Sequence, residues 1–127
     1  MQKQEKEQTH FSVRSKVWIV NADGEVVFGS GRYRILETVE RLGSLNAAAK
    51  ELHMSYKGLW SRITATERRL GWSLLIRDKS GSRLTPKAVD LMKRFKRVNR
   101  MVASECDEVF DNFIKGALEE KKDRKPG

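Results

Sequence analysis

Two spacings of hydrophobic residues divide this chain into a short β region followed by a longer helical region. Between residues 12 and 29, small or apolar side chains alternate with longer or charged ones, as in a β-strand. The Asp23-Gly24 pair interrupts the alternation, and Asp-Gly readily adopts the positive φ of a tight hairpin turn. We therefore expect a β-hairpin ahead of the main body of the chain.

After Gly31 the apolar spacing changes to three and four residues, the period of an amphipathic helix. Gly43 is expected to end the first helix as its C-cap. Ser44 and Ser55 are expected to begin a second and a third helix, because serine is a favoured N-cap residue. Gly71 ends the third helix. The stripe of the first helix consists of Ile35, Leu36, Val39 and Leu42.

A second hairpin and a long helix are predicted for the rest of the chain. Extended runs at 73–77 and 82–85 flank a basic turn, and Thr85 is expected to cap the last helix. This helix has no breaker before about residue 120 except Gly116, so it would be on the order of 50 Å long. A small domain cannot cover so long an apolar stripe, which favours pairing with a second copy; a bent helix folding back is the alternative. The residues expected at the dimer interface are Leu91, Phe95, Val98, Val102, Val109 and Phe113.

The third helix separates an apolar face from a cationic one when its residues are placed at 100° intervals. The apolar side carries Leu59, Ile63, Thr66 and Leu70. The opposite side carries only small polar and basic residues, namely Lys57, Ser61, Thr64 and Arg68. Small side chains permit close approach to a groove of duplex DNA, and hydrogen-bond donors reach base edges and phosphates. Together with the preceding Ala-rich helix, this predicts a helix-turn-helix followed by a basic wing.

Positive charge is concentrated in the part of the chain that contains the predicted helix-turn-helix and wing. The net charge is +9, and residues 30–100 carry 17 basic and six acidic residues, a net charge of +11. Residues 1–29 have no net charge, and residues 101–127 have a net charge of −2. A basic segment between such ends is typical of a protein that binds a polyanion, although surface charge for solubility is an alternative.

Little in the sequence points to catalysis, metal binding or a membrane. His10 and His53 have no partner at the spacing of a catalytic triad or metal site, and Cys106 is the single cysteine. No apolar run reaches the roughly 18–20 residues of a transmembrane helix, and the polar N-terminus has no secretion signal. We therefore expect a cytoplasmic protein that is not an enzyme and has no cofactor, metal or small-molecule effector site.

Residues 43–85 resemble the winged helix-turn-helix of LysR-type regulators, through "GSLNAAAKELHMS", "ERRLG" and "LT". More closely, "MSYKGLW" at 54–60, the segment 28–50 and the expected first hairpin resemble the N-terminal domain of ModE, the molybdate-responsive repressor family. This resemblance implies a homodimer that binds a palindromic operator in double-stranded DNA. It also implies the contact residues, which are Ser55, Tyr56, Lys57 and Ser61 for bases, Arg62 and Ser44 for phosphates, and Lys79, Ser80 and Arg83 in the wing.

The chain departs from the ModE pattern in two ways. The wing is shorter than the glycine-rich wing of the family, and the sequence stops after the long helix instead of continuing into a molybdate-binding domain. We therefore expect a DNA-binding module that lacks an effector domain, so that the sensing of molybdate or another effector is not implied.

The expected fold is mainly α with small β-hairpins. It divides into a flexible tail at 1–12, a winged helix-turn-helix domain with an N-terminal hairpin at 13–85, a dimerisation helix at 86–120 and a disordered tail at 121–127. The expected function is sequence-specific DNA binding by a homodimeric transcription regulator. The alternatives are a non-specific architectural DNA-binding protein and a protein-interaction adaptor, which would show no consensus sequence and no duplex binding, respectively.

Overall fold

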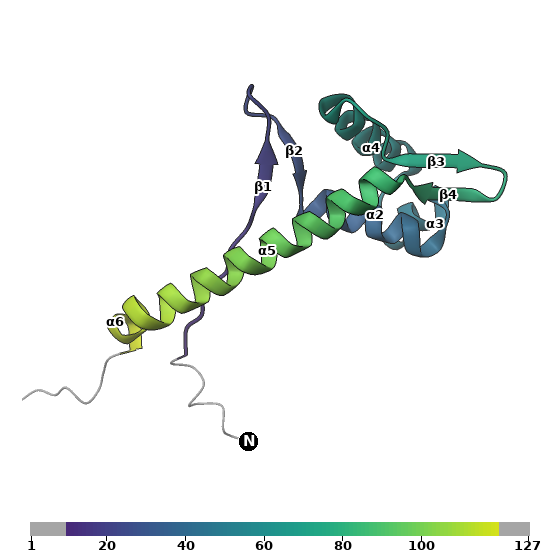
Figure 1. The fold of residues 1–127 in the computed structure, drawn as a ribbon. Coiled ribbons are helices and arrows are strands. Elements are labelled where there is room, and N and C mark those ends of the chain that lie inside the picture. Colours follow the sequence, from purple (N-terminus) through teal and green to yellow (C-terminus); the bar gives the residue numbers. More distant parts are fainter. Residues whose placement is uncertain (1–9, 120–127) are drawn as a thin grey trace, which may run out of the picture. The chain divides into compact units, whose positions relative to one another are not determined.

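The structure is a computed structural model that describes residues 10–119 (Figure 1). Its elements in chain order are β1 (Trp18–Val20), β2 (Val26–Gly29), α2 (Ser30–Leu42), α3 (Leu45–Glu51), α4 (Tyr56–Leu70), β3 (Leu75–Asp78), β4 (Gly81–Leu84), α5 (Pro86–Phe113) and α6 (Lys115–Glu119). The described chain divides into two compact units, one formed by Val17–Arg97 and the other by residues 10–16 and 98–119. The predicted mainly α fold with small antiparallel hairpins is confirmed.

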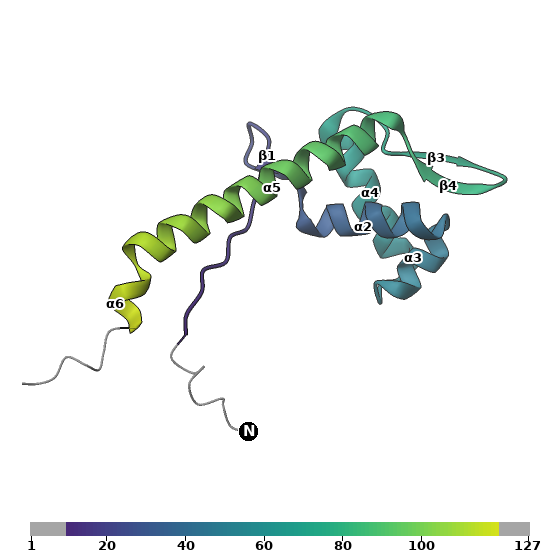
Figure 2. The ribbon, with the colours of Figure 1, turned by 60° about the horizontal axis from the view of Figure 1, so that its bottom comes forward.

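Helices α2, α3 and α4 surround the hydrophobic core of the Val17–Arg97 unit (Figure 2). The apolar side predicted for α4 faces this core, since Leu59, Ile63 and Thr66 are buried and Leu70 is partly buried. The alanines of α3 have little bulk, and Ala48 and Ala49 are buried in this core. Besides the α4 residues, the most deeply buried side chains of the unit include Phe28, Leu36, Val39, Ala48, Leu74 and Ala88.

The caps predicted from the sequence fix the ends of these helices. The Ser44 hydroxyl accepts a hydrogen bond from the Ala47 amide at 3.1 Å, and the Ser55 hydroxyl accepts one from Gly58 at 2.9 Å. Gly43 and Gly71 end α2 and α4 in the left-handed conformation, with φ of 69° and 86°. His53 also has a positive φ, 56°, which turns the chain between α3 and α4. The predicted helix-turn-helix connection is therefore confirmed.

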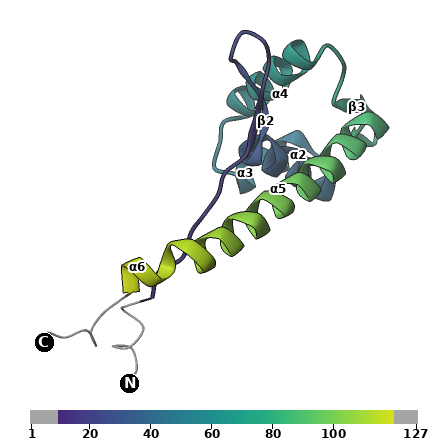
Figure 3. The same ribbon diagram turned by 60° about the vertical axis from the view of Figure 1, so that its left-hand side comes forward.

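The first hairpin pairs β1 with β2 from Trp18 opposite Gly29 to Val20 opposite Val26. Figure 3 shows β2 next to α4. The side-chain oxygen of Asn21 organises the turn by accepting hydrogen bonds from the amides of Asp23 and Glu25, both at 3.0 Å. Strand β1 is shorter than the alternating sequence predicted. Its partner strand ends at Gly29, where α2 begins, so residues before Trp18 have no strand to pair with.

The second hairpin, called the wing from here on, comprises β3, β4 and the turn between them. Its strand β4 is fastened to the C-terminal end of α2, because the Ser82 amide donates to the Gly43 carbonyl at 3.0 Å. Gly81 makes this approach possible. It has a φ of +125°, and a Cβ atom there would lie 2.4 Å from the Gly43 carbonyl oxygen. The Leu84 amide also donates to the Glu40 carboxylate at 2.9 Å.

Helix α5 begins as predicted, with the Thr85 hydroxyl accepting a hydrogen bond from the Ala88 amide at 3.1 Å. Its residue Phe95, expected at a dimer interface, instead lies in the core of its own chain. The Phe95 ring packs edge-on against Phe28, with centroids 5.1 Å apart, and lies 6.0 Å from Tyr33. Leu91 is partly buried against the same core. The expectation for Phe95 is therefore wrong. The apolar residues of α5 do not all face one surface: Phe95 packs into the core of its own chain, whereas others, such as Val98, are exposed.

The prediction of one continuous helix that reaches about residue 120 is also wrong. Helix α5 ends at Phe113, and α6 begins at Lys115, close to Gly116, whose low helix propensity weakens a continuous helix. In the unit outside Val17–Arg97, Phe110 is buried, and the Phe11 amide donates a hydrogen bond to the Glu119 carboxylate at 3.0 Å. The expected tails fall largely outside the described residues, at 1–9 and 120–127. Within the described part of the chain, no helix is long and apolar enough to cross a membrane.

Candidate nucleic-acid interface

The outward face of α4 presents the cationic and small polar residues that the helical spacing predicted. Lys57, Ser61 and Arg68 are exposed on it, and Arg62 is exposed on the flank beside it. Thr64 is partly buried, and its hydroxyl donates to the Ser61 carbonyl at 3.1 Å. The first turn of α4 contains no acidic residue, so the positive end of the helix dipole is not compensated from within that turn. This face can therefore approach a surface of negative charge.

Two of the predicted contact residues have a structural role as well. The hydroxyls of Ser44 and Ser55 cap α3 and α4, so each already accepts a hydrogen bond from its own helix. Each hydroxyl can still donate its own proton to an acceptor. Lys57 differs from them, because no hydrogen bond or ion pair of its ammonium group is found within residues 10–119. Its ammonium group is therefore free to bind an incoming acceptor.

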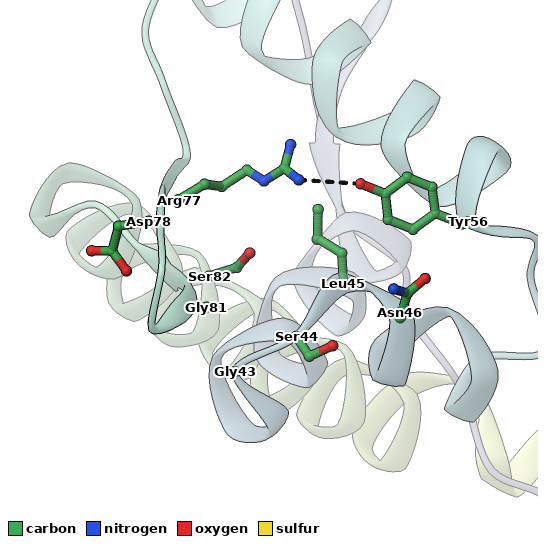
Figure 4. Close-up of a pocket in the computed structure, with 9 residues that line it drawn as sticks. All are labelled: Gly43, Ser44, Leu45, Asn46, Tyr56, Arg77, Asp78, Gly81 and Ser82. Carbon is green, nitrogen blue, oxygen red and sulfur yellow. Dashed lines mark hydrogen bonds between the residues drawn. The ribbon is translucent and has the colours of Figure 1, made fainter.

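The wing is connected to the start of α4 by Arg77, whose orienting contacts the sequence did not reveal. The Arg77 guanidinium donates to the Tyr56 hydroxyl at 3.2 Å and lies over the Trp60 ring, 4.8 Å from its centroid. Figure 4 shows Arg77 and Tyr56 pointing toward one another across a pocket, with Ser44 and Asn46 of the neighbouring α3 region along one side. The two aromatic residues expected on one flank of α4 thus hold the wing beside it.

This pocket has a volume of about 400 Å³ and opens between the wing and the start of α3. Its wall is mostly polar, with the Arg77 guanidinium and the Asp78 carboxylate on the wing side. It brings the predicted contact residues Ser44 and Tyr56 together with wing residues. The full set of lining residues is Gly43, Ser44, Leu45, Asn46, Tyr56, Arg77, Asp78, Gly81 and Ser82.

Asp78 organises the tip of the wing and engages two of the three predicted wing contacts. Its carboxylate accepts hydrogen bonds from the Ser80 hydroxyl at 2.6 Å, the Ser80 amide at 2.9 Å and the Arg83 guanidinium at 2.9 Å. These bonds, first from Ser80 and then from Arg83, lower the pKa of Asp78 from 3.8 to about 2. Lys79, exposed at the turn, is the predicted wing residue whose charge is not neutralised by Asp78.

Glu67 connects the C-terminal half of α4 to the start of the wing. Its carboxylate accepts a hydrogen bond from the Leu74 amide at 2.7 Å. This contact was not predicted, because it links α4 to a loop whose position follows from packing. The acidic residue nearest the outward face is therefore turned toward the backbone before β3, which leaves the outward face cationic.

Comparison with known proteins identifies the central segment. Residues 31–89 match the family model described as "Bacterial regulatory helix-turn-helix protein, lysR family". The chain is 34% identical over 73 residues to the HTH-type transcriptional regulator YofA of Bacillus velezensis, and this match covers 58% of the chain. It is 28% identical over 82 residues, or 65% of its length, to a probable RuBisCO transcriptional regulator of Emiliania huxleyi. The chain spans about a quarter of the length of these curated relatives, 25% and 26% respectively.

Solved structures agree with this family match. The DNA-binding domain of CbnR in complex with DNA is 26% identical, with a TM-score of 0.53, over 64% of this chain and 93% of that one. Full-length CbnR, crystallised with its target DNA, is 27% identical, with a TM-score of 0.51, over 61% of this chain and 27% of that one. The residues that the family model matches contain α3, α4, the wing and all but the first residue of α2. Residues 31–89 therefore match the helix-turn-helix domain of LysR-type regulators.

Proposed function

We propose that this chain binds double-stranded DNA in a sequence-specific manner, as the DNA-binding part of a cytoplasmic transcription regulator. The observation that carries the proposal is the outward face of α4, where Lys57 and Ser61 are exposed beside small polar neighbours and without an acidic residue in the first turn. A helix of this kind fits the major groove of B-DNA, where each base pair offers a distinct pattern of donors and acceptors. The likeness to a DNA-bound domain supports the same placement.

Lys57 is proposed as the principal reader of bases. Its side chain is exposed on the first turn of α4, two residues after the serine that caps the helix. Tyr56 is proposed to act at the margin, because its hydroxyl is already bonded to Arg77. Ser61, Thr64 and Arg68 continue the outward face along the helix, and Arg62 lies beside it. The proposed wing contacts are Lys79, Ser80 and Arg83.

The proposed assembly is a homodimer that reads a palindromic operator. Helix α5 supports this, because several large apolar residues remain exposed along it, including Val98, Met101, Val109 and Phe113. Val102 is partly buried on the same helix. A two-fold dimer places two copies of α4 in successive major grooves, so the operator mirrors the symmetry of the protein.

A closer relationship to the ModE-type repressors is part of the proposal. The motif at residues 54–60 and the β1–β2 hairpin ahead of α2 support it. Substituting this chain's α4 for the corresponding helix of a ModE-type repressor tests the relationship. Recognition of a ModE-type operator by the chimera would support it, and loss of that recognition would contradict it.

Selection of bound duplexes from a random pool tests the main proposal. We expect a two-fold symmetric consensus, and Lys57→Ala should weaken binding to it by about 1–3 kcal/mol while relaxing the preference at one position of each half-site. Lys96→Ala is the matched control, since it removes the same charge from an exposed site on α5. A pool without a consensus would favour a non-specific architectural protein, and no duplex binding at low salt would favour a protein-interaction adaptor.

A further inference from the structure

Three arginines gather on the flank of α4 that lies opposite the wing. Arg62 and Arg69 come from α4, and Arg32 comes from the first turn of α2. At 100° per residue, Arg62 and Arg69 fall on the same side of α4, whereas Tyr56 and Trp60 fall on the other. Arg32, Arg62 and Arg69 are called the arginine cluster below.

A hydrogen bond to Thr66 holds the side chain of one member of the cluster, Arg32, in place. The Arg32 Nε donates to the Thr66 hydroxyl at 2.8 Å, and that hydroxyl donates to the Arg62 carbonyl, also at 2.8 Å. Thr66 is 1% exposed, so it forms a rigid support. The bond to Thr66 uses the Nε of Arg32 and leaves the two terminal nitrogens of its guanidinium for another acceptor.

Acidic side chains compensate the cluster only at one end. Arg69 donates to the Val26 carbonyl at 2.9 Å, and its Nε lies 3.7 Å from the Glu25 carboxylate. Within residues 10–119, neither Arg32 nor Arg62 forms an ion pair with a carboxylate. Burial, followed by the charges of Arg69 and Arg62, lowers the pKa of Arg32. The positive charges of Arg69 and Arg62 therefore act unfavourably on Arg32, and a bound anion would relieve this effect.

The cluster is suited to an anion at the surface of the protein. Arg32 and Arg62 line the same small cavity against Leu36 and Ile63, but its volume of about 10 Å³ is too small for a ligand. Arg62 is exposed on the flank of α4 beside the outward face. Planar guanidinium groups match the geometry of phosphate oxygens, and the two free oxygens of a backbone phosphate can accept from more than one arginine at once.

We infer that Arg32 and Arg62, with Arg69 beside them, bind one backbone phosphate of the DNA strand that borders α4 on the side away from the wing. This inference rests on the proposed function and deepens it, because it adds Arg32 and Arg69 to the interface and gives α4 a backbone contact on each flank. The wing contacts one strand, and the arginine cluster contacts the other. Such contacts fix the orientation of α4 in the groove without reading sequence themselves.

The salt dependence of duplex binding tests the number of phosphates that the cluster holds. Each phosphate neutralised by the protein adds about −0.9 to the slope of log K against log salt. The double variant Arg32→Gln/Arg62→Gln should therefore reduce the slope by about 0.9 in magnitude, which is the loss of one phosphate. Arg34→Gln/Arg94→Gln removes two exposed charges from α2 and α5 and should leave the slope near that of the wild type. Arg62→Gln changes an exposed side chain and leaves the part-buried Arg32–Thr66 hydrogen bond in place. A smaller slope in this single variant would therefore not result from a disturbed fold.

A reduction no larger than that of the control would overturn the inference while leaving the proposed function intact. A reduction of about 1.8 would also overturn it, since that corresponds to two separate phosphates. NMR signals of the arginine Nε–H groups distinguish the source of the anion: Arg32 should respond to the duplex and not to millimolar inorganic phosphate. A response to inorganic phosphate alone, in a protein that binds no duplex, would identify a free-anion site and contradict both proposals.

Discussion

The guanidinium carbon of Arg77 lies 4.8 Å from the ring centroid of Trp60, which links the wing to the second turn of α4. The same guanidinium donates to the Tyr56 hydroxyl, so one side chain engages both aromatic residues of this flank. A cation–π contact at an exposed site contributes about 0.5–1 kcal/mol. That energy is small for the whole fold but large for a hairpin of two four-residue strands. Arg77 therefore joins the wing to α4, in addition to the bonds that fasten β4 to α2.

Two substitutions of Arg77 should distinguish its role in orienting the wing from the effect of its positive charge. Arg77→Ala is expected to increase the mobility of residues 79–82, because the cation–π contact and the Tyr56 bond are both lost. ¹⁵N relaxation of these amides measures the change, and Arg77→Lys restores the charge without the planar guanidinium. We expect Arg77→Lys to be closer to Arg77→Ala than to the wild type in mobility. Equal order parameters in all three proteins would show that Arg77 does not orient the wing.

Gly81 should be intolerant of any side chain. Gly81→Ala forces a Cβ atom toward the Gly43 carbonyl oxygen at 2.4 Å and holds a non-glycine residue at a φ of +125°. The backbone strain alone is expected to lower the free energy of unfolding by about 1–3 kcal/mol. Urea denaturation measures this change. Gly116→Ala is the control, because it lies in α6 with no atom within 4 Å of its Cβ position, and it should stabilise the helix by about 0.5–1 kcal/mol.

The wing should lose its internal order in acid. The pKa of Asp78 is about 2 in the folded chain, against an ordinary value of 3.8, because Ser80 and Arg83 donate to its carboxylate. A lowered pKa means that this stabilisation is fully present above about pH 4 and is lost as the pH falls through 2. The Ser80 amide shift in NMR should follow this transition, and Asp78→Asn should abolish it. A midpoint near 3.8 in the wild type would contradict the hydrogen bonds described here.

The parts of the fold that depend on residues close together in the sequence could be predicted from the sequence. Ser44, Ser55, Gly43 and Gly71 mark helix ends because a cap acts within one turn of its own helix. The outward face of α4 also followed from the sequence alone, because it depends on periodicity within one element.

Contacts between distant residues could not be predicted in this way. Arg32 meets Thr66 across 34 positions of the chain, and Gly81 meets Gly43 across 38, only because α2, α4 and the wing pack together. Phe95 shows the same limit. Its helical spacing predicts that it is buried, but only the packing shows that Phe28 and Tyr33 cover it rather than a second chain.

The charges of α5 favour an antiparallel arrangement in the proposed dimer. Residues 86–100 carry six basic residues and one acidic residue, whereas residues 101–113 carry four acidic residues and no basic one. An antiparallel pair places the basic half of each helix beside the acidic half of its partner, and a parallel pair places like charges together. Salt screens both effects. Dimerisation should therefore weaken with added salt if the helices are antiparallel and strengthen if they are parallel.

Sedimentation equilibrium at low and high salt measures this dependence, and Met101 provides the matched variant. Met101 is 61% exposed in the single chain, on the part of α5 where the two charge halves meet. Met101→Glu should abolish dimerisation, because it places a carboxylate within an apolar contact that offers it no partner. Ser104→Glu adds the same charge at an exposed polar position and should leave the dimer intact. A dimer that survives Met101→Glu would show that α5 does not pair through its exposed apolar residues.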